Sequence, residues 1–226
     1  MVLTGAGISA ESGVPTFRDA DGLWEGHHVE DVATPEGYER DPERVLRFYD
    51  ERRAALAGVV PNSAHEALAR LEAAVGEELL VVTQNVDDLH ERGGLQRVVH
   101  MHGELLKAWC TACDRRHHWE TTLLERPGCP GCGAAALRPD VVWFGEVPYH
   151  MDLIIDHLTE AEIFVSIGTS GAVYPAAGFV QHARRHGARA TELNLEPSEG
   201  SFFFHDSRQG RAGDLVPSWV DELLGG

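Results

Sequence analysis

The chain has 226 residues, of which 43% are hydrophobic and 24% charged, so it can bury a core and is neither a fibrous nor a disordered protein. It has 19 Lys and Arg residues against 36 Asp and Glu residues, a formal net charge of -17, which disfavours binding to nucleic acid or to an anionic membrane. No apolar run approaches the ~18 residues of a membrane span, and the N-terminus lacks the pattern of a signal peptide. We therefore expect a soluble, cytoplasmic monomer.

Short apolar segments alternate with amphipathic ones along the chain. The expected strands are Val2–Leu3, Leu79–Thr83, Val98–Met101, Glu162–Ile167, Thr191–Leu195 and Ser201–Phe204. Several are apolar almost throughout, which is typical of a parallel sheet covered on both faces. The expected helices are Pro42–Ala57, Ser63–Val75 and Pro175–Arg185, the second with a capping box of Ser63 and Glu66. This alternation predicts an α/β fold, a Rossmann-like parallel sheet with helices on both faces.

Two segments interrupt the alternation of strands and helices. Residues 26–57 and 106–139 predict a smaller second domain, with a helical insert and a cysteine module. The remaining residues, 1–25, 58–105 and 140–226, are assigned to the Rossmann-like domain.

All four cysteines lie in the second of these segments. They form a C-x2-C pair, a gap of fifteen residues and another C-x2-C pair: Cys110, Cys113, Cys129 and Cys132. This spacing is typical of a tetrahedral four-thiolate zinc site. The alternatives are four buried free thiols or two redox dithiols, although a redox pair more naturally begins a helix next to a strand. Four thiolates leave no open position for water, so we expect one structural Zn2+.

The first strand runs directly into the glycine-rich sequence GAGISAESG, residues 5–13. Such a turn between a strand and a helix start lets backbone N–H groups approach a phosphate. Ala10 stands at the third glycine position, which a variant of the dinucleotide fingerprint permits, but a glycine turn alone is weak evidence. Taken alone, Phe17 and Arg18 in the following loop fit a core anchor and a surface ion pair.

Seven motifs occur in the order seen in sirtuins, the NAD-dependent protein lysine deacylases, and the chain resembles this family over nearly its whole length. The motifs are GAGISAESGVPTFR from Gly5, TQNVDDLH from Thr83, His102-Gly103, the two cysteine pairs, VWFGE from Val142, GTS from Gly168 and NLE from Asn194. The resemblance implies that NAD is a consumed co-substrate and that acylated lysine side chains of proteins are the partners.

The resemblance also implies which residues bind NAD. They are Gly5, Ala6, Gly7, Ser9, Glu11, Thr16, Phe17, Arg18, Trp24, Gln84, Asn85, Asp87, Gly168, Thr169, Ser170, Asn194, Glu196 and Ala212. The glycine loop would hold the pyrophosphate, and Asn85 and Asp87 the nicotinamide, since a carboxamide pairs well with another carboxamide. Asn194 and Glu196 would bind the adenosine ribose, although alone they fit a solvated turn, and Ala212 fits a simple turn residue.

His102 is the expected general base, and the resemblance implies Asn85 as a second catalytic residue. An unperturbed histidine has a pKa of about 6.5 and accepts a proton at neutral pH. His100, two positions earlier, would share its face of the same strand, but only His102 precedes the family's glycine. In the implied reaction the acyl oxygen displaces nicotinamide from the ribose, and His102 then deprotonates a ribose hydroxyl. The products are free lysine, nicotinamide and O-acyl-ADP-ribose.

Residues Val142, Trp143, Phe144 and Gly145 resemble the strand that pairs with the substrate peptide. β-Augmentation of this kind takes its affinity from main-chain hydrogen bonds, so we expect low selectivity for peptide sequence. Core packing is the alternative for Trp143.

The helix 42–57 carries Tyr49 and Arg52 one turn apart on an otherwise apolar face. An arginine in this position most often snorkels to solvent or pairs with a carboxylate. The Tyr-x-x-Arg pair resembles the branch of sirtuins that removes acidic acyl groups. The resemblance therefore implies that Tyr49 and Arg52 bind the carboxylate of succinyl, malonyl or glutaryl lysine.

Other classes of protein explain less of the sequence. A nucleic-acid-binding zinc ribbon fits the cysteines but not the charge of -17. A hydride-transferring dehydrogenase accounts for the glycine loop but not for His102-Gly103 or the cysteine pairs. We rank the acidic deacylase first, a plain protein lysine deacetylase second and a protein ADP-ribosyltransferase third.

Overall fold

The computed structural model describes residues 1–16, 23–24 and 26–225. The strands are β1 Val2–Thr4, β2 Leu23–Trp24, β3 His27–His28, β4 Val81–Thr83, β5 Val98–His100, β6 Gly103–Cys110, β7 Arg116–His118, β8 Leu137–Val141, β9 Ile163–Ile167, β10 Arg189–Asn194 and β11 Asp206–Gln209. The α-helices are α1 Val29–Val32, α2 Pro35–Arg40, α3 Pro42–Leu56, α4 Ser63–Val75, α5 Leu89–Arg92, α6 Met151–Glu160, α7 Phe179–Arg185 and α8 Ala212–Leu224. Among the described residues, no helix has the length and apolar character needed to cross a bilayer.

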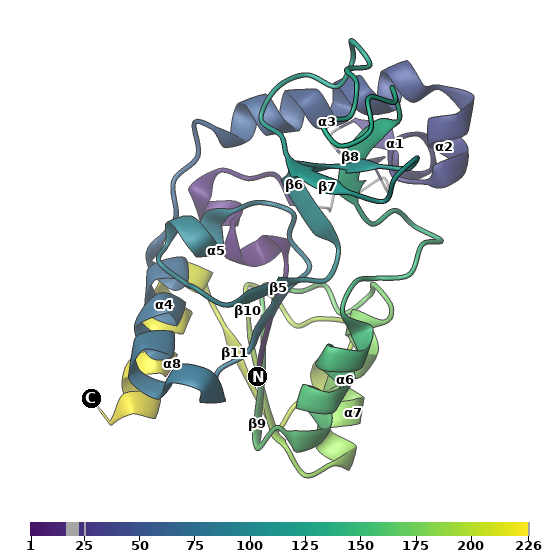
Figure 1. Ribbon diagram of the computed structural model, residues 1–226. Coiled ribbons are helices and arrows are strands. Elements are labelled where there is room, and N and C mark those ends of the chain that lie inside the picture. Colours follow the sequence, from purple (N-terminus) through teal and green to yellow (C-terminus); the bar gives the residue numbers. More distant parts are fainter. Residues whose placement is uncertain (17–22, 25, 226) are drawn as a thin grey trace.

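Six strands form one parallel sheet in the order β11-β10-β9-β1-β4-β5 (Figure 1). The central strand β1 pairs with β4 on one side and β9 on the other, so that Val2 lies between Val81 and Val165. The chain first builds the sheet outwards from β1 to β5 and later from β9 to β11. The strand order therefore reverses beside β1, and parallel sheets bind ligands at the carboxyl ends of strands at such a point.

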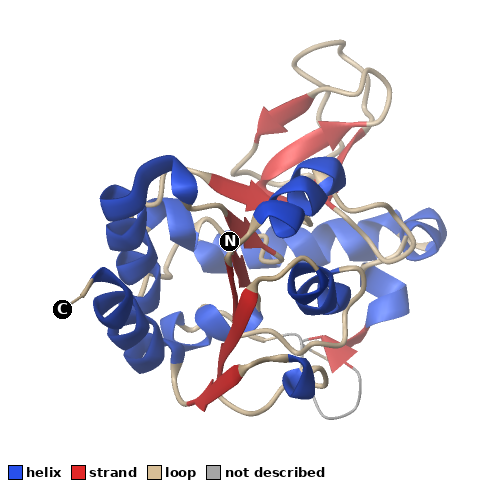
Figure 2. Cartoon of the chain, turned by 90° about the horizontal axis from the view of Figure 1, so that it is seen from below, coloured by secondary structure: helices blue, strands red, loops and turns tan. Residues whose placement is uncertain are grey.

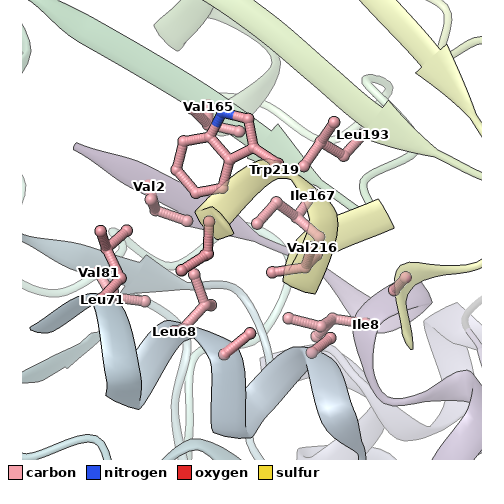
Figure 3. Close-up of a cluster of buried hydrophobic side chains, with 14 of the residues drawn as sticks. Val2, Ile8, Leu68, Leu71, Val81, Val165, Ile167, Leu193, Val216 and Trp219 are labelled. Carbon is pink, nitrogen blue, oxygen red and sulfur yellow. The ribbon is translucent and has the colours of Figure 1, made fainter. Parts of the chain in front are cut away.

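Helices cover both faces of this sheet (Figures 1 and 2). Side chains alternate across a strand, so Val2 faces the core beneath α4 and α8, whereas Leu3 faces the core beneath α6 and α7. Figure 3 shows the first core, where Leu68 of α4 lies close to Val216 of α8 and to the strands. Each fully buried apolar side chain of this size stabilises the fold by ~1.5–3 kcal/mol. The predicted Rossmann-like α/β architecture is confirmed.

A second sheet lies beside α3 at the far end of the molecule (Figure 1), with three antiparallel strands in the order β7-β6-β8. Asp50 of α3 joins the helix to the loop before the second cysteine pair, because its carboxylate accepts from the Leu123 N–H at 2.9 Å. The same carboxylate pairs with Arg53 at 2.6 Å, and Arg53 Nε donates to the Leu105 carbonyl of β6 at 3.1 Å. These bonds fix the position of α3 relative to the small sheet.

The N-terminal cap of α4 differs from the prediction of Ser63 and Glu66. Asn62 is the capping residue: its side chain accepts from the Ala64 N–H at 3.0 Å, and its own N–H donates to His65 Nδ1 at 3.2 Å. Ser63 instead donates to the Gly213 carbonyl of α8, at 2.7 Å. The capping box therefore lies one residue earlier, with His65 in the place usually taken by Glu or Gln.

The predicted strand Ser201–Phe204 is wrong, because Ser201–Phe203 is a 3-10 turn. Phe203 and Phe204 pack against the core beneath α6 and α7, which explains their apolar character without a strand. The edge strand is Asp206–Gln209, a polar segment that sequence periodicity did not mark. The expected helix Pro175–Arg185 is likewise split into a 3-10 turn, Ala176–Gly178, and α7.

Candidate active site

The glycine loop after β1 packs directly on the turn after β9. Gly7 N–H donates to the Gly168 carbonyl at 2.8 Å, and a Cβ on Gly7 would lie only 2.7 Å from Gly168 Cα. Gly168 itself has φ of +63°, and a Cβ there would lie 2.4 Å from Ile8 N. Only glycine allows this approach. Two loops at the carboxyl ends of neighbouring strands thus form a cradle of backbone atoms, which suits a pyrophosphate.

Ser9, Asn85 and Asp87 form one buried polar cluster at the ends of β1 and β4. Ser9 Oγ donates to Asp87 Oδ2 at 3.1 Å and accepts from Asn85 Nδ2 at 3.2 Å. His65 Nε2 lies 3.4 Å from the same Ser9 oxygen. Burial raises the pKa of Asp87, although the bonds from the Leu89 N–H and Ser9 lower it in part. The cluster offers carboxamide and carboxylate groups that fit a carboxamide ligand such as nicotinamide.

His100 and His102 bond in the same way to two successive backbone carbonyls. His100 Nδ1 lies 3.1 Å from Asn85 O, and His102 Nδ1 lies 3.2 Å from Gln84 O. A carbonyl only accepts, so each Nδ1 carries a proton. Burial lowers the pKa of His100, but the bond from Nε2 to Glu91 at 2.7 Å and the charge of Glu91 raise it overall. Both ring nitrogens of His100 thus face acceptors, the Asn85 carbonyl and the Glu91 carboxylate, and this arrangement favours the protonated ring.

His102 is in the opposite state. Burial lowers its pKa more than the Gln84 carbonyl raises it, so at neutral pH the ring is uncharged. Because Nδ1 holds the proton, Nε2 carries the lone pair and can accept a proton. The strand β5 ends at His100, so His102 lies in the turn before β6 rather than on the same strand as expected. Gly103, with φ of +81°, permits this turn, because a Cβ there would lie 2.1 Å from the Asp140 carbonyl.

The predicted residues after β9 and β10 also meet. Asn194 Nδ2 donates to the Thr169 carbonyl at 2.7 Å, and the Thr169 hydroxyl lies 2.8 Å from Ser166 Oγ. The Ser170 carbonyl accepts a bond from the Glu199 N–H, which lies in the loop after β10. Glu196 is exposed in that loop after β10.

The other predicted NAD residues are spread more widely. Glu11 accepts from the Gly213 N–H of α8 at 2.9 Å, which brings it next to the buried Ala212. Ala6 lies in the 3-10 turn after Gly5, and Thr16 is exposed. Phe17, Arg18 and the side chain of Trp24 lie outside the described residues.

The four cysteines converge as their spacing predicts. The Sγ atoms of Cys110 and Cys132 lie 3.7 Å apart, and those of Cys113 and Cys129 lie 3.8 Å apart. All four sulfur atoms lie within 4.8 Å of one another. A tetrahedron with Zn–S bonds of ~2.3 Å has edges of about 3.8 Å, so the arrangement fits a four-thiolate zinc ion. These separations are far longer than a disulfide bond of ~2.05 Å.

The segment 142–146 continues the chain from β8, which ends at Val141, and turns at Phe144 and Gly145. Val142 N–H donates to the His102 carbonyl at 2.9 Å, which places the turn next to His102. Glu146 closes the turn, because its carboxylate accepts from the Trp143 N–H at 2.8 Å. Gly145 has φ of +91° and Phe144 is 45% exposed.

Tyr49 and Arg52 lie one turn apart on α3, and Tyr49 packs against Trp143 of this segment. Tyr49 is fully buried and its hydroxyl accepts from Trp143 Nε1 at 2.9 Å. Arg52 is half-buried, lies over the Phe48 ring at 3.1 Å and donates to the Phe48 carbonyl at 2.7 Å. Because Trp143 directly follows Val142, two hydrogen bonds and one residue step connect His102 to Tyr49.

Sequence reasoning missed several polar side chains that support the site. Arg138 stacks on the ring of Trp143, His65 Nε2 lies 3.4 Å from Ser9 Oγ, and His117 Nε2 lies 3.3 Å from Cys129 Sγ. Glu192 is buried within β10 and accepts from Ser201 and Ser207. A carboxylate inside an expected strand was a visible signal for Glu192, whereas the other three depend on tertiary packing.

Comparison with known proteins identifies the class to which this fold and site belong. Residues 5–175 match the Sir2 family. A Yersinia pestis protein named NAD-dependent protein deacylase is 56% identical over 227 residues, which cover 99% of this chain and 82% of that protein. The chain therefore belongs to the Sir2 family.

Two solved structures agree with this assignment. An ADP-ribose complex of a mutant Sir2 homologue superimposes with a TM-score of 0.92 at 37% identity, covering 99% of this chain and 91% of that one. A Sir2 complex with a deacetylated peptide and 3'-O-acetyl ADP-ribose gives a TM-score of 0.85 at 28% identity, with 98% and 92% covered.

Proposed function

We propose that this member of the Sir2 family is an NAD-dependent protein deacylase that removes acidic acyl groups, namely succinyl, malonyl and glutaryl, from lysine side chains. The name of the Yersinia pestis relative supports the activity. The observation that carries the acyl preference is the bond from Trp143 to Tyr49, because Trp143 follows the residue that is bonded to His102 and Arg52 lies one helical turn from Tyr49 on α3.

The described residues fit the NAD that the family requires. The Gly7–Gly168 cradle suits the pyrophosphate, the Ser9, Asn85 and Asp87 cluster suits the nicotinamide, and Asn194 at the end of β10 suits the adenosine ribose. When bound, NAD supplies the ribose that accepts the acyl group as nicotinamide leaves.

In this proposal His102 is the general base. Its Nε2 accepts the proton of a ribose hydroxyl, and the Gln84 carbonyl holds the proton on Nδ1, which keeps the ring in the reactive tautomer. The four thiolates would hold a structural Zn2+, which would join the turn that follows β6 to the second cysteine turn.

Tyr49 and Arg52 supply donors for an acyl carboxylate. The Arg52 guanidinium now donates to the Phe48 carbonyl, and a substrate carboxylate would be a stronger, charge-assisted acceptor for it. Burial raises the pKa of Tyr49, so the phenol keeps its proton and remains a donor. An acetyl group offers neither residue a charge, so both favour acidic acyl groups.

Mass spectrometry of succinylated and acetylated versions of one peptide, with and without NAD, tests the proposal. We expect NAD-dependent loss of succinyl, faster than loss of acetyl and accompanied by O-succinyl-ADP-ribose. Arg52→Met should lower the ratio of succinyl to acetyl rates ~10-fold or more, the value of a hydrogen bond to a charged group. The control Arg47→Met, an exposed residue of the same helix that pairs with Glu43, should leave the ratio unchanged.

Three results would contradict the proposal. Faster removal of acetyl by the unmodified protein would leave a plain deacetylase. An ADP-ribose adduct on the target protein, without freed lysine, would indicate a transferase. An unchanged ratio in Arg52→Met would remove that residue from acyl recognition.

A further inference from the structure

The hydrogen bond between Trp143 and Tyr49 has a fixed direction. Trp143 Nε1 lies 2.9 Å from the Tyr49 oxygen, and the two residues are 2% and 0% exposed. An indole N–H donates and never accepts, so the phenol oxygen is the acceptor of this bond. The Tyr49 O–H must therefore point towards an acceptor other than Trp143.

The indole of Trp143 is itself held by a partly buried ion pair. The Arg138 guanidinium lies 3.4 Å from the centre of the Trp143 ring and forms two bonds to Glu146, at 2.7 and 2.9 Å. Glu146 also accepts from the Trp143 backbone N–H, and Arg138 donates to the Val141 carbonyl at 2.8 Å. The ion pair thus contacts the Trp143 ring, the Trp143 backbone and the end of β8.

Such a pair costs free energy, because the Arg138 guanidinium is buried and the half-buried Glu146 side chain, 25% exposed, also loses part of its hydration. Arg138 is only 6% exposed. The best-attested benefit of such an ion pair is that it specifies one arrangement among several of similar energy. In this chain the arrangement that it specifies is the turn that presents Trp143 to Tyr49.

We infer that Trp143 is a specificity-determining positioning residue, whose indole N–H orients the Tyr49 hydroxyl as a donor to the acyl carboxylate. The Arg138–Glu146 ion pair keeps the indole in place. This inference rests on the proposed preference for acidic acyl groups. A carboxylate accepts from the oriented hydroxyl and an acetyl methyl group does not, so only acidic substrates benefit.

A double-mutant cycle tests the coupling between the two residues. Trp143→Phe removes the N–H and keeps an aromatic ring for Arg138, and Tyr49→Phe removes the hydroxyl. We expect Tyr49→Phe to lower the ratio of kcat/KM for succinyl to acetyl peptide ~10-fold, and Trp143→Phe to lower it ~5-fold, mainly through KM for the succinyl peptide. The double variant should be no worse than Tyr49→Phe alone.

Two further variants separate positioning from general damage. Trp109→Phe is the matched control: Trp109 also lies beside Arg138, with 5.0 Å to its ring centre, but its indole donates to Asp114. This change should leave the ratio unchanged. Arg138→Lys keeps the charge but not the two-pronged bond, and it should lower the ratio as Trp143→Phe does. Thermal midpoints and zinc content show that each variant is folded.

The outcomes distinguish this inference from the proposed function. Additive effects in the cycle, or an equal loss of succinyl and acetyl rates in Trp143→Phe, would overturn the role of Trp143. If the protein prefers succinyl and Tyr49→Phe abolishes that preference while Trp143→Phe does not, only the present inference fails. If the unmodified protein has no preference for succinyl, the proposed function fails and the inference with it.

Discussion

We expect acid to lower the free energy of unfolding of this protein through His65, a buried side chain at the start of α4. The Asn62 N–H donates to its Nδ1, so the neutral ring carries its proton on Nε2, towards Ser9. Burial lowers the pKa of His65 from 6.5 to about 4. Below pH 6.5 the unfolded chain takes up a proton that the folded chain refuses until about pH 4, so the free energy of unfolding falls as the pH decreases across this window. The loss from this residue is about 1.4 kcal/mol at pH 5.5 and about 3 kcal/mol at pH 4.

His65→Gln is the matched variant, because a glutamine in this position accepts the Asn62 N–H in a capping box and does not titrate. Urea unfolding followed by tryptophan fluorescence should show that the unmodified protein loses about 3 kcal/mol more than the variant between pH 7 and pH 4. His90, whose pKa burial lowers to about 3, and the four cysteines are present in both proteins, so their contributions largely cancel. Equal losses in the two proteins would refute the assigned state of His65.

Two other measurements follow from the site. The acid limb of kcat/KM should lie below pH 6.5, because burial lowers the pKa of His102 and protonation of Nε2 removes the base; a limb above pH 6.5 would contradict this assignment. Purified protein should contain one Zn2+ per chain, and chelation at pH 7 should lower the thermal midpoint by several degrees, since the metal binds the folded cysteine turns. A zinc content near zero, or a thermal midpoint that chelation does not change, would indicate that the four cysteines are free thiols.

The helix α3 shows which elements can be predicted from sequence. Asp41 caps it, Pro42 begins it, and its apolar spacing marks the face that is buried. The segment after β10 shows the limit. Phe203 and Phe204 are apolar because a 3-10 turn presses them on the core, whereas the edge strand Asp206–Gln209 has one exposed side and a polar sequence. Apolar character reports burial, and burial alone does not distinguish a strand from a turn.

In the candidate site too, some contacts can be predicted from the sequence and others cannot. Ser9 and Asp87 are far apart in the chain, yet both follow strands of a parallel sheet, and neighbouring strands end at the same edge, so their meeting follows from the topology. The stacking of Arg138 on Trp143 and the bond from Trp143 to Tyr49 follow from no spacing rule. They join β8, a turn and α3, and arise only when the small sheet packs on that helix.

His100 and His102, near the end of β5, differ in their suitability as the general base. Both rings donate from Nδ1 to successive carbonyls, so the tautomer does not separate them. The difference lies at Nε2: His100 meets Glu91, and among the described residues no carboxylate forms an ion pair with His102. A base must hold its lone pair at neutral pH, which the charge of Glu91 denies to His100. His102 lies in the turn that its following glycine allows before β6, and its side-chain bond is to the Gln84 carbonyl, a neutral acceptor that leaves Nε2 as the base.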